Sequence, residues 1–298
     1  MNAPGATVAQ HSLARFAPSA RRRRTDRLAR GLLGAGTALA LVPLVLVVYY
    51  LLNKGLSAWS LGFFTSDPTG NTFFGGAGIG GIKSALLGTI EIVALASVIA
   101  IPLGVGVALW LVEYGKQGRF ANAVRFFVDI LTGVPSIVFG LFIYIVLVVG
   151  VGNAGYKGSL ALVLLMLPVV IRTSEVVLTL VPDSLRESAL ALGAPRWRVV
   201  FSVVLPTALG GMVTGVLLAV ARAAGETAPL LFTAASTNKT VFNLRGTMNS
   251  LPVQIYNDVI SPTQSVVNRA WGAALALVVL ILIVNLIARA ISRRSRLA

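Results

Sequence analysis

The sequence has 298 residues, of which 56% are hydrophobic and only 12% are charged, and its mean hydropathy is +0.85. Soluble domains carry about 25% charged residues, so this balance excludes an ordinary soluble protein and predicts an all-α integral membrane protein. The formal net charge is +15, but the basic residues flank apolar segments, where anionic lipid attracts them. We therefore expect membrane lipid, and no nucleic acid, as the partner of these charges.

The sequence contains no cysteine and a single histidine, His11, in a polar N-terminal segment. The lack of cysteine excludes disulfide bonds, thiolate metal sites and cysteine nucleophiles. One isolated histidine does not make a metal cluster or a catalytic triad. We expect no metal, no cofactor and no covalent catalysis.

Residues 1–30 contain the run RRRRTDRLAR, and we predict a basic, disordered cytoplasmic tail that faces the membrane. The apolar run that follows, 31–52, is longer than the roughly 7–15 residues of a signal-peptide core, so we expect an uncleaved first span. The predicted organisation is a tail, 1–30, followed by one membrane domain, 31–298.

Apolar windows of about 20 residues predict six transmembrane helices. Pro102 and Pro135 lie inside the second and third of these, which we expect to be tilted or broken there. An orientation with both termini in the cytoplasm places nearly three times as many lysines and arginines inside as outside, in agreement with the positive-inside rule. The predicted spans are 31–52, 85–112, 125–150, 159–181, 208–233 and 270–291.

Residues 76–81 read GAGIGG and match the pattern G-x-G-x-x-G. A dinucleotide site requires a strand before this pattern and a βαβ unit around it, and neither is predicted here. We interpret the segment as a flexible, glycine-rich lead into the second span. The pattern G-x-x-x-x-G-K-[ST] does not occur, so we expect no ATP binding by a phosphate loop of this chain.

The loop between the fourth and fifth predicted spans, 183–206, has the pattern of a short helix. Asp183 or Ser184 is a plausible N-cap, and Glu187 would complete a capping box with Ser184. The helix is expected to run to Leu192 and to stop at Gly193, because glycine readily takes a positive φ. Such a helix either docks in the groove of a partner or lies on the membrane surface.

The same loop resembles the signature of ABC importer permeases, E-A-A-x-x-x-G followed after nine residues by I-x-L-P. Serine replaces the first alanine and valine replaces the isoleucine, while all spacings hold. In that family the loop forms a coupling helix that docks in a cleft of the ATPase subunit. The resemblance therefore implies an ATPase-coupling role for Glu187, Ser188, Ala189, Gly193, Leu205 and Pro206.

The resemblance extends over nearly the whole chain beyond the tail and is most specific for the PstA-type permeases of phosphate-specific ABC importers. The segments LTGVPSIVFGLF, LLAVARAAGETAPLLFTA and SLPVQIYN are among those similar to that family in the same order. It implies a type I importer (MetI-like) fold, a bacterial inner-membrane location and import of inorganic phosphate. It also implies three partners: a PstC-type second permease, PstB-type ATPase subunits that hydrolyse the ATP, and an extracytoplasmic phosphate-binding protein.

Two arginines lie near the middle of predicted spans, Arg172 in the fourth and Arg222 in the fifth. An arginine at the centre of a membrane helix costs about 2.5–3.5 kcal/mol on insertion scales, so each is expected to face protein or a water-filled path. Glu175 and Glu226 follow them at helical spacing, which permits two purely structural ion pairs. The alternative is that the two arginines and the two glutamates line the pathway of phosphate, because the planar guanidinium group binds two oxygens of an oxyanion at once.

Four further features are interpreted as structural. Glu91 and Asp129 lie nearer the ends of spans and are expected in packing or at an interface, and Asn285 is expected to form an interhelical hydrogen bond. The segment GVPS, 133–136, is expected to be a hinge.

Three other functions stay open at this stage: an importer of another oxyanion or an uncharged nutrient, an ion-gradient secondary transporter, and a membrane-anchored sensor or scaffold. A secondary transporter predicts inverted repeats, which are not evident here.

Overall fold

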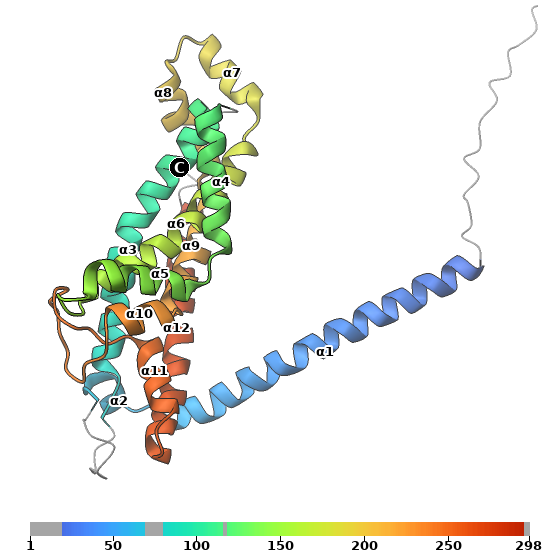
Figure 1. Ribbon diagram of the computed structural model, residues 1–298. Helices are drawn as coiled ribbons and strands as arrows, with labels where there is room; N and C mark the ends of the chain where they lie inside the picture. The colour runs from blue at the N-terminus through green and yellow to red at the C-terminus, as the bar shows by residue number, and fades with distance from the viewer. Residues whose placement is uncertain (1–19, 69–79, 116–117, 295–298) are drawn as a thin grey trace, which may run out of the picture. The chain divides into compact units, whose positions relative to one another are not determined.

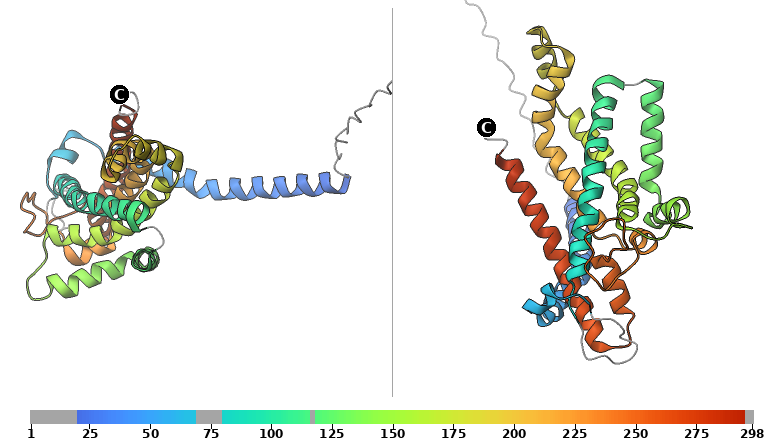
Figure 2. Two further views of the ribbon diagram at one scale, coloured as in Figure 1. Left: turned by 90° about the horizontal axis from the view of Figure 1, so that it is seen from above. Right: turned by 90° about the vertical axis from the view of Figure 1, so that its left-hand side faces the viewer.

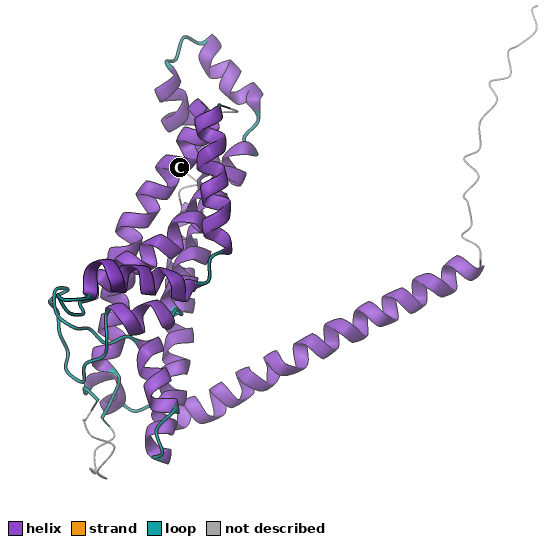
Figure 3. Cartoon of the chain, in the orientation of Figure 1, coloured by secondary structure: helices purple, strands orange, loops and turns teal. Residues whose placement is uncertain are grey.

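The computed structural model describes residues 20–68, 80–115 and 118–294, and every regular element within these ranges is a helix (Figure 3). The chain divides into two compact units, 1–50 and 51–298, and each is described by itself. Most of the glycine-rich segment 76–81 lies outside the described residues.

The first unit consists, in its described part, of most of helix α1 (Ala20–Ala58) (Figure 1, blue). It contains the predicted span 31–52, and its side chains are exposed from Arg24 to Tyr50. An apolar helix exposed on all sides suits a lipid environment. Residues 20–30, predicted to be disordered, are helical, in keeping with the high helix propensity of arginine, alanine and leucine. The rest of the predicted tail, 1–19, lies outside the described residues.

The second unit is a bundle in which α7 lies at one end and α11 at the other (Figures 1 and 2). Three short π-helical segments, η2 to η4, continue neighbouring α-helices. After α1 the elements are α2 (Leu61–Thr65), α3 (Lys83–Leu109), η2 (Trp110–Gly115), α4 (Arg119–Gly133), α5 (Ser136–Ile143), η3 (Tyr144–Val148), α6 (Gly155–Thr179), α7 (Asp183–Ala191), α8 (Arg196–Val199), η4 (Val200–Val204), α9 (Leu205–Ala224), α10 (Ala228–Thr233), α11 (Leu251–Val259) and α12 (Gln264–Arg294).

Among the described residues, five continuous helices are long and apolar enough to cross a membrane, and a bent pair makes a sixth. The predicted number of six is therefore confirmed when the pair counts as one span. The five are Arg24–Ala58, Lys83–Gly115, Gly155–Thr179, Arg196–Ala224 and Gln264–Ala290.

The third predicted span is broken, as its proline suggested. Its two parts, Arg119–Gly133 and Ser136–Val148, meet at 101°. Proline drives the preceding residue away from helical geometry, and Val134 has φ −73° and ψ 130°. Pro102 has no such effect, because α3 continues through it. The hinge expected at GVPS is thus a sharp corner between α4 and α5.

The fifth predicted span, 208–233, was placed wrongly at both ends. The continuous helical run begins at Arg196 and ends at Ala224, and a separate short helix, α10, follows. Pro229 explains the break, because it has no N–H to donate to the carbonyl of Gly225 and its ring would clash with that carbonyl. The residues from Gly225 to Thr227 are therefore not helical in the way the hydropathy pattern suggested.

The core lies where α3 and α9 pack against α6. Fully buried side chains on α3 and α6, such as Ile92, Leu162 and Met166, belong to one cluster. On α9, Gly211 and Gly215 are one turn apart, and an added Cβ would lie 2.6 Å from the side chain of Val177 and 2.5 Å from that of Thr173, respectively. Two small residues at this spacing let membrane helices approach closely. This packing holds α6 and α9, the helices that carry Arg172 and Arg222.

Candidate substrate pathway and coupling loop

Arg172 is part of a cluster of four charges that joins α4 and α6. Its Nη1 donates to Oε2 of Glu175 at 3.0 Å, which confirms the predicted intrahelical pair. Its Nη2 lies 3.4 Å from Oδ1 of Asp129 on α4. The second oxygen of Glu175 accepts a bond from Arg125 Nε at 2.5 Å. Two cations thus face two anions, and the formal charge of the cluster is zero.

Arg125 is the member of this cluster that the sequence reading missed. Its Nη2 also donates to the carbonyl of Leu111 in η2 at 3.1 Å, so one side chain ties together α4, α6 and the end of α3. Glu175 is the most deeply buried of the four, with 9% of its side chain exposed. The sequence offered no signal for this contact, because Arg125 and Glu175 are 50 positions apart and Arg125 reads as a basic residue flanking a span.

Arg172 also lines an open cavity of about 760 Å³ between α6, α9 and α12. A second arginine, Arg289 of α12, lines the same cavity, as do Thr214 and Asn285. Nearly half of the Arg172 side chain is exposed, so its guanidinium group remains accessible while it is paired. Neither Arg222 nor Glu226 lines this cavity, so the structure does not bring the two predicted arginines into one pocket.

Arg222 and Glu226 form a loose pair at a helix end. Arg222 Nε lies 3.5 Å from Glu226 Oε1, at the limit of a hydrogen bond, and half of the arginine side chain is exposed. The expectation that both lie within one helix is wrong, because α9 ends at Ala224. Arg222 lies in the last turn of α9, where the helix dipole favours a cation. Glu226 follows the break and leads into α10.

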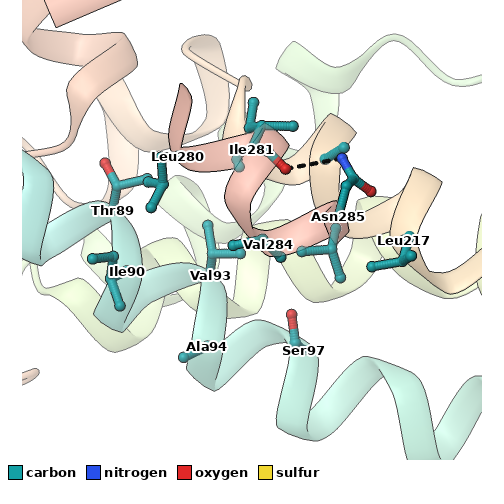
Figure 4. Close-up of a pocket in the computed structure, with 13 residues that line it drawn as sticks. Thr89, Ile90, Val93, Ala94, Ser97, Leu217, Leu280, Ile281, Val284 and Asn285 are labelled. Atoms are coloured by element: carbon teal, nitrogen blue, oxygen red, sulfur yellow. Dashed lines mark hydrogen bonds between the residues drawn. The ribbon is translucent and has the colours of Figure 1, made fainter. Parts of the chain in front are cut away.

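A second, smaller cavity of about 240 Å³ lies between α3, α9 and α12 (Figure 4). Its walls are mostly aliphatic, with Thr89, Ser97 and Asn285 as the polar exceptions. Asn285 Nδ2 donates to the carbonyl of Ile281 in its own helix at 2.9 Å, so the expected interhelical hydrogen bond is not the one it forms. With no charged residue in its walls, this cavity does not suit an oxyanion. Glu91 is half-buried on α3 and joins neither charged cluster.

The predicted loop helix is α7, and it has no buried residue. Gly193 has φ +80°, as expected for its stop. The N–H of Gly193 bonds to the carbonyl of Leu190, and that of Ala194 bonds to the carbonyl of Ala189, which together make a Schellman motif. The predicted capping box is wrong: the N-cap is Pro182 and no side chain caps the helix, because Asp183 pairs with Arg186 instead.

Arg186 fixes α7 to the ends of two spans, and the sequence reading missed it. Its Nη2 donates to Glu113 of η2 and to the carbonyl of Leu178 in α6, both at 3.0 Å. Its Nη1 donates to the carbonyl of Val181 at 2.6 Å and to Asp183 at 3.1 Å. Only 15% of this side chain is exposed. One side chain therefore joins α7 to the end of α6 and to η2, which continues α3.

The residues of the E-A-A signature fall on two parts of this loop. Glu187 and Ser188 are exposed on α7, and Ala189 is half-buried. Leu205 and Pro206 begin α9, where Leu205 packs against the apolar cluster of Val204 and its neighbours. The large apolar side chains exposed on this loop are Leu185, Leu190, Leu192, Trp197 and Phe201.

The helical bundle with its corner at α4–α5 and its exposed loop helix has the fold of the type I (MetI-like) importer permeases. A structure of a bacterial alginate ABC transporter in complex with alginate pentasaccharide-bound periplasmic protein contains a chain that matches with a TM-score of 0.63 at 16% identity, covering 92% of this chain and 96% of that one. A chain of the MetNI methionine ABC transporter in an inward facing conformation matches with a TM-score of 0.58 at 20% identity, covering 71% and 94%. These likenesses concern the fold alone.

The family model described as binding-protein-dependent transport system inner membrane component matches residues 100–297. The chain is 40% identical over 277 residues to the phosphate transport system permease protein PstA of Yersinia pestis, with 92% of each chain covered. It is 40% identical over 290 residues to PstA 1 of Mycobacterium tuberculosis, with 93% of this chain and 92% of that one covered. The chain therefore belongs to the binding-protein-dependent inner membrane component family and, within it, to the PstA permeases.

Proposed function

We propose that this chain is the transmembrane permease subunit of an ATP-driven importer that moves inorganic phosphate into the cytoplasm. The observation that carries the proposal is the likeness, over more than nine-tenths of the chain, to two phosphate transport permeases. Family membership also favours a binding-protein-dependent importer over an ion-gradient secondary transporter. The partners are a second, PstC-type permease, PstB-type ATPase subunits and an extracytoplasmic phosphate-binding protein. The ATPase subunits bind and hydrolyse ATP, because the sequence of this chain has no phosphate loop.

In the proposed orientation both termini and α7 face the cytoplasm. α7 and the turn after it are the coupling element: the exposed leucines at 185, 190 and 192 offer an apolar face to a groove in the ATPase. Glu187 and Ser188 flank this face, and Gly193 sets the turn that presents it. Closure of the ATPase subunits moves α7, and Arg186 transmits the movement to α6.

We assign Arg222 the main role in handling the anion, and Glu226 the role of a competitor for it. The contact between them is long, at 3.5 Å, and half of the arginine side chain is exposed, so an oxyanion can reach the guanidinium group and take the place of the carboxylate. When the anion moves on, Glu226 closes again on the arginine and favours release. We assign Arg172 and Glu175 a lesser role in handling the anion, because they already form ion pairs with Asp129 and Arg125, respectively. They position α6 beside the large cavity and add positive potential to it.

The proposal is tested by uptake of labelled phosphate in cells that lack only this chain. We expect uptake to be lost and to be restored by the wild-type chain. Excess unlabelled phosphate should compete, whereas excess sulfate should not. If uptake of phosphate through the assembled complex were unchanged without the chain, or if another nutrient alone were affected, the proposed function would be wrong.

A further inference from the structure

A further pocket lies at the start of α6, and two cations, Lys157 and Arg245, line it. The start of α6 is the end of that helix away from α7 (Figure 1). The pocket has a volume of about 680 Å³, and its polar walls come from Asn153, Tyr156, Lys157 and Arg245. No acidic residue lines it. The pocket is separate from the large cavity that Arg172 lines, and the two share no residue.

Lys157 is the unusual member of this pocket, because only 2% of it is exposed and it forms no ion pair with any described residue. Its Nζ donates to the carbonyl of Gly152 at 2.6 Å and lies 5.7 Å from the centre of the Tyr156 ring. No carboxylate of an aspartate or glutamate lies within 4 Å of Nζ, and every aspartate and glutamate of the chain belongs to the described residues. A buried ammonium group that donates to one carbonyl and has no anion is costly. An anion from outside the chain would complete the site.

Arg245 adds a second cation at the rim. The loop that carries it is fixed to the first turn of α6, because Gly155 N donates to the carbonyl of Gly246 and Tyr156 N donates to that of Leu244, both at 2.9 Å. The side chain of Arg245 is exposed, and its guanidinium forms no ion pair with any described residue. The backbone thus holds the arginine beside the pocket while its charge stays available.

Two residues of the pocket wall, Asn153 and Ala154, form hydrogen bonds with the segment that follows Glu226. Asn153 Nδ2 donates to the carbonyl of Phe232 at 2.7 Å, and Ala154 N donates to that of Thr233 at 3.1 Å. Both acceptors lie at the end of α10, which begins two residues after Glu226. At about 1.5 Å per residue, this six-residue helix makes a short link between the pocket and the Arg222–Glu226 pair.

We infer that the pocket of Asn153, Tyr156, Lys157 and Arg245 is an outer binding site for a free phosphoryl oxyanion, which occupies it before reaching Arg222. This inference rests on the proposed function and on the proposed orientation, which places the pocket outside the cytoplasm. The buried ammonium and the guanidinium at the rim supply the charge, and the amide and the phenol supply further hydrogen-bonding groups. Occupancy of the pocket acts on Glu226 through α10.

The test uses the lack of native cysteine. Val151 lines the pocket and is 77% exposed, so a cysteine at this position reports on the pocket without disturbing the core. In the purified full-length chain, an anionic methanethiosulfonate reagent should modify Val151→Cys several-fold faster than a cationic one, because the neighbouring cations attract the first reagent and repel the second. Inorganic phosphate should slow the modification more than chloride at equal ionic strength.

Three background variants, one of them a control, identify the groups responsible. Arg245→Gln removes an exposed charge and leaves the fold intact, so it should reduce both the preference for the anionic reagent and the protection by phosphate. Lys239→Gln removes an exposed charge of the same long loop that does not line the pocket, and both quantities should stay at the wild-type value. Lys157→Gln should abolish the protection, and chromatography of the variant establishes that it is folded.

Equal rates for the two reagents, or no protection by phosphate beyond that of chloride, would overturn the inference. So would protection that persists unchanged in the Arg245→Gln background. Because protection is measured on the purified chain and import is measured in cells, the two failures are distinct. Import without protection refutes only the outer site, whereas protection without import refutes the proposed function.

Discussion

Replacement of Arg222 by glutamine separates a transport role from a structural ion pair. In the structure this arginine is at the end of α9, half-exposed, and 3.5 Å from its single carboxylate partner, Glu226. Glutamine keeps much of the length and the hydrogen-bonding capacity of the side chain and removes its charge. We expect Arg222→Gln to reduce phosphate uptake by more than tenfold without lowering the amount of assembled complex.

The geometry sets how much of that loss a structural pair can explain. An exposed ion pair contributes about 0.2–1 kcal/mol to stability, whereas a tenfold change in rate corresponds to about 1.4 kcal/mol in the transport barrier. The side chain of Glu226 is only 16% exposed, so its carboxylate, left without the arginine, adds a cost that only the double variant removes. The Arg125–Glu175 contact is different, because it is 2.5 Å long and its glutamate is 9% exposed. A large loss of uptake in Arg222→Gln that persists in the double variant therefore exceeds what the loss of its ion pair supplies.

The assay is initial uptake of labelled phosphate, normalised to the assembled complex, in Arg222→Gln, Arg222→Lys and the double variant Arg222→Gln with Glu226→Gln. Lysine keeps the charge and loses the planar fork, so its uptake should be intermediate. The double variant should remain defective, because the cation is still missing. Recovery of transport in the double variant would refute the reasoning and reduce Arg222 to the partner of an otherwise orphaned carboxylate.

Three further predictions concern topology, coupling and the charge cluster. A cysteine at Asn238, which is exposed, should react with an impermeant thiol reagent in intact cells, and one at Leu192 should react only after permeabilisation; the reverse pattern would invert the proposed orientation. Gly193→Val forces a β-branched residue to φ +80°, at a cost of about 1–2 kcal/mol or more, and should abolish uptake while membrane insertion is retained. Gly193→Asn should be tolerated, and equal activity of the two variants would show that the turn has no part in coupling. Arg125→Gln leaves a buried carboxylate with a weaker partner, so it should destabilise the folded chain by about 1–3 kcal/mol. The measurement is thermal unfolding in detergent, and an unchanged midpoint would show that the cluster is not structural.

The membrane class, the number of spans and the loop helix could be predicted from the sequence, because each depends on local patterns. Hydropathy alone locates five of the six spans to within about seven residues at each end, since the length of an apolar run is dictated by the membrane. The turn at Gly193 could be predicted for a similar reason, because a positive φ is a requirement on one residue and glycine meets it. The E-A-A signature is likewise contained within 20 residues of sequence.

The contacts that define the candidate sites were decided only by the tertiary structure. Glu175 pairs with Arg125, 50 residues away, as well as with its neighbour Arg172, and Arg186 pairs with Glu113, 73 residues away, as well as with its neighbour Asp183. No local pattern indicates the two distant partners. The break at Gly225 changed the reading of Arg222 from the middle of a helix to its last turn, although Pro229 was visible in the sequence. Lys157 read as an ordinary basic residue of an outer loop, yet it is buried, with no counter-charge among the described residues. Sequence periodicity reports which residues share a face of one helix, whereas burial and charge compensation depend on which helices pack together.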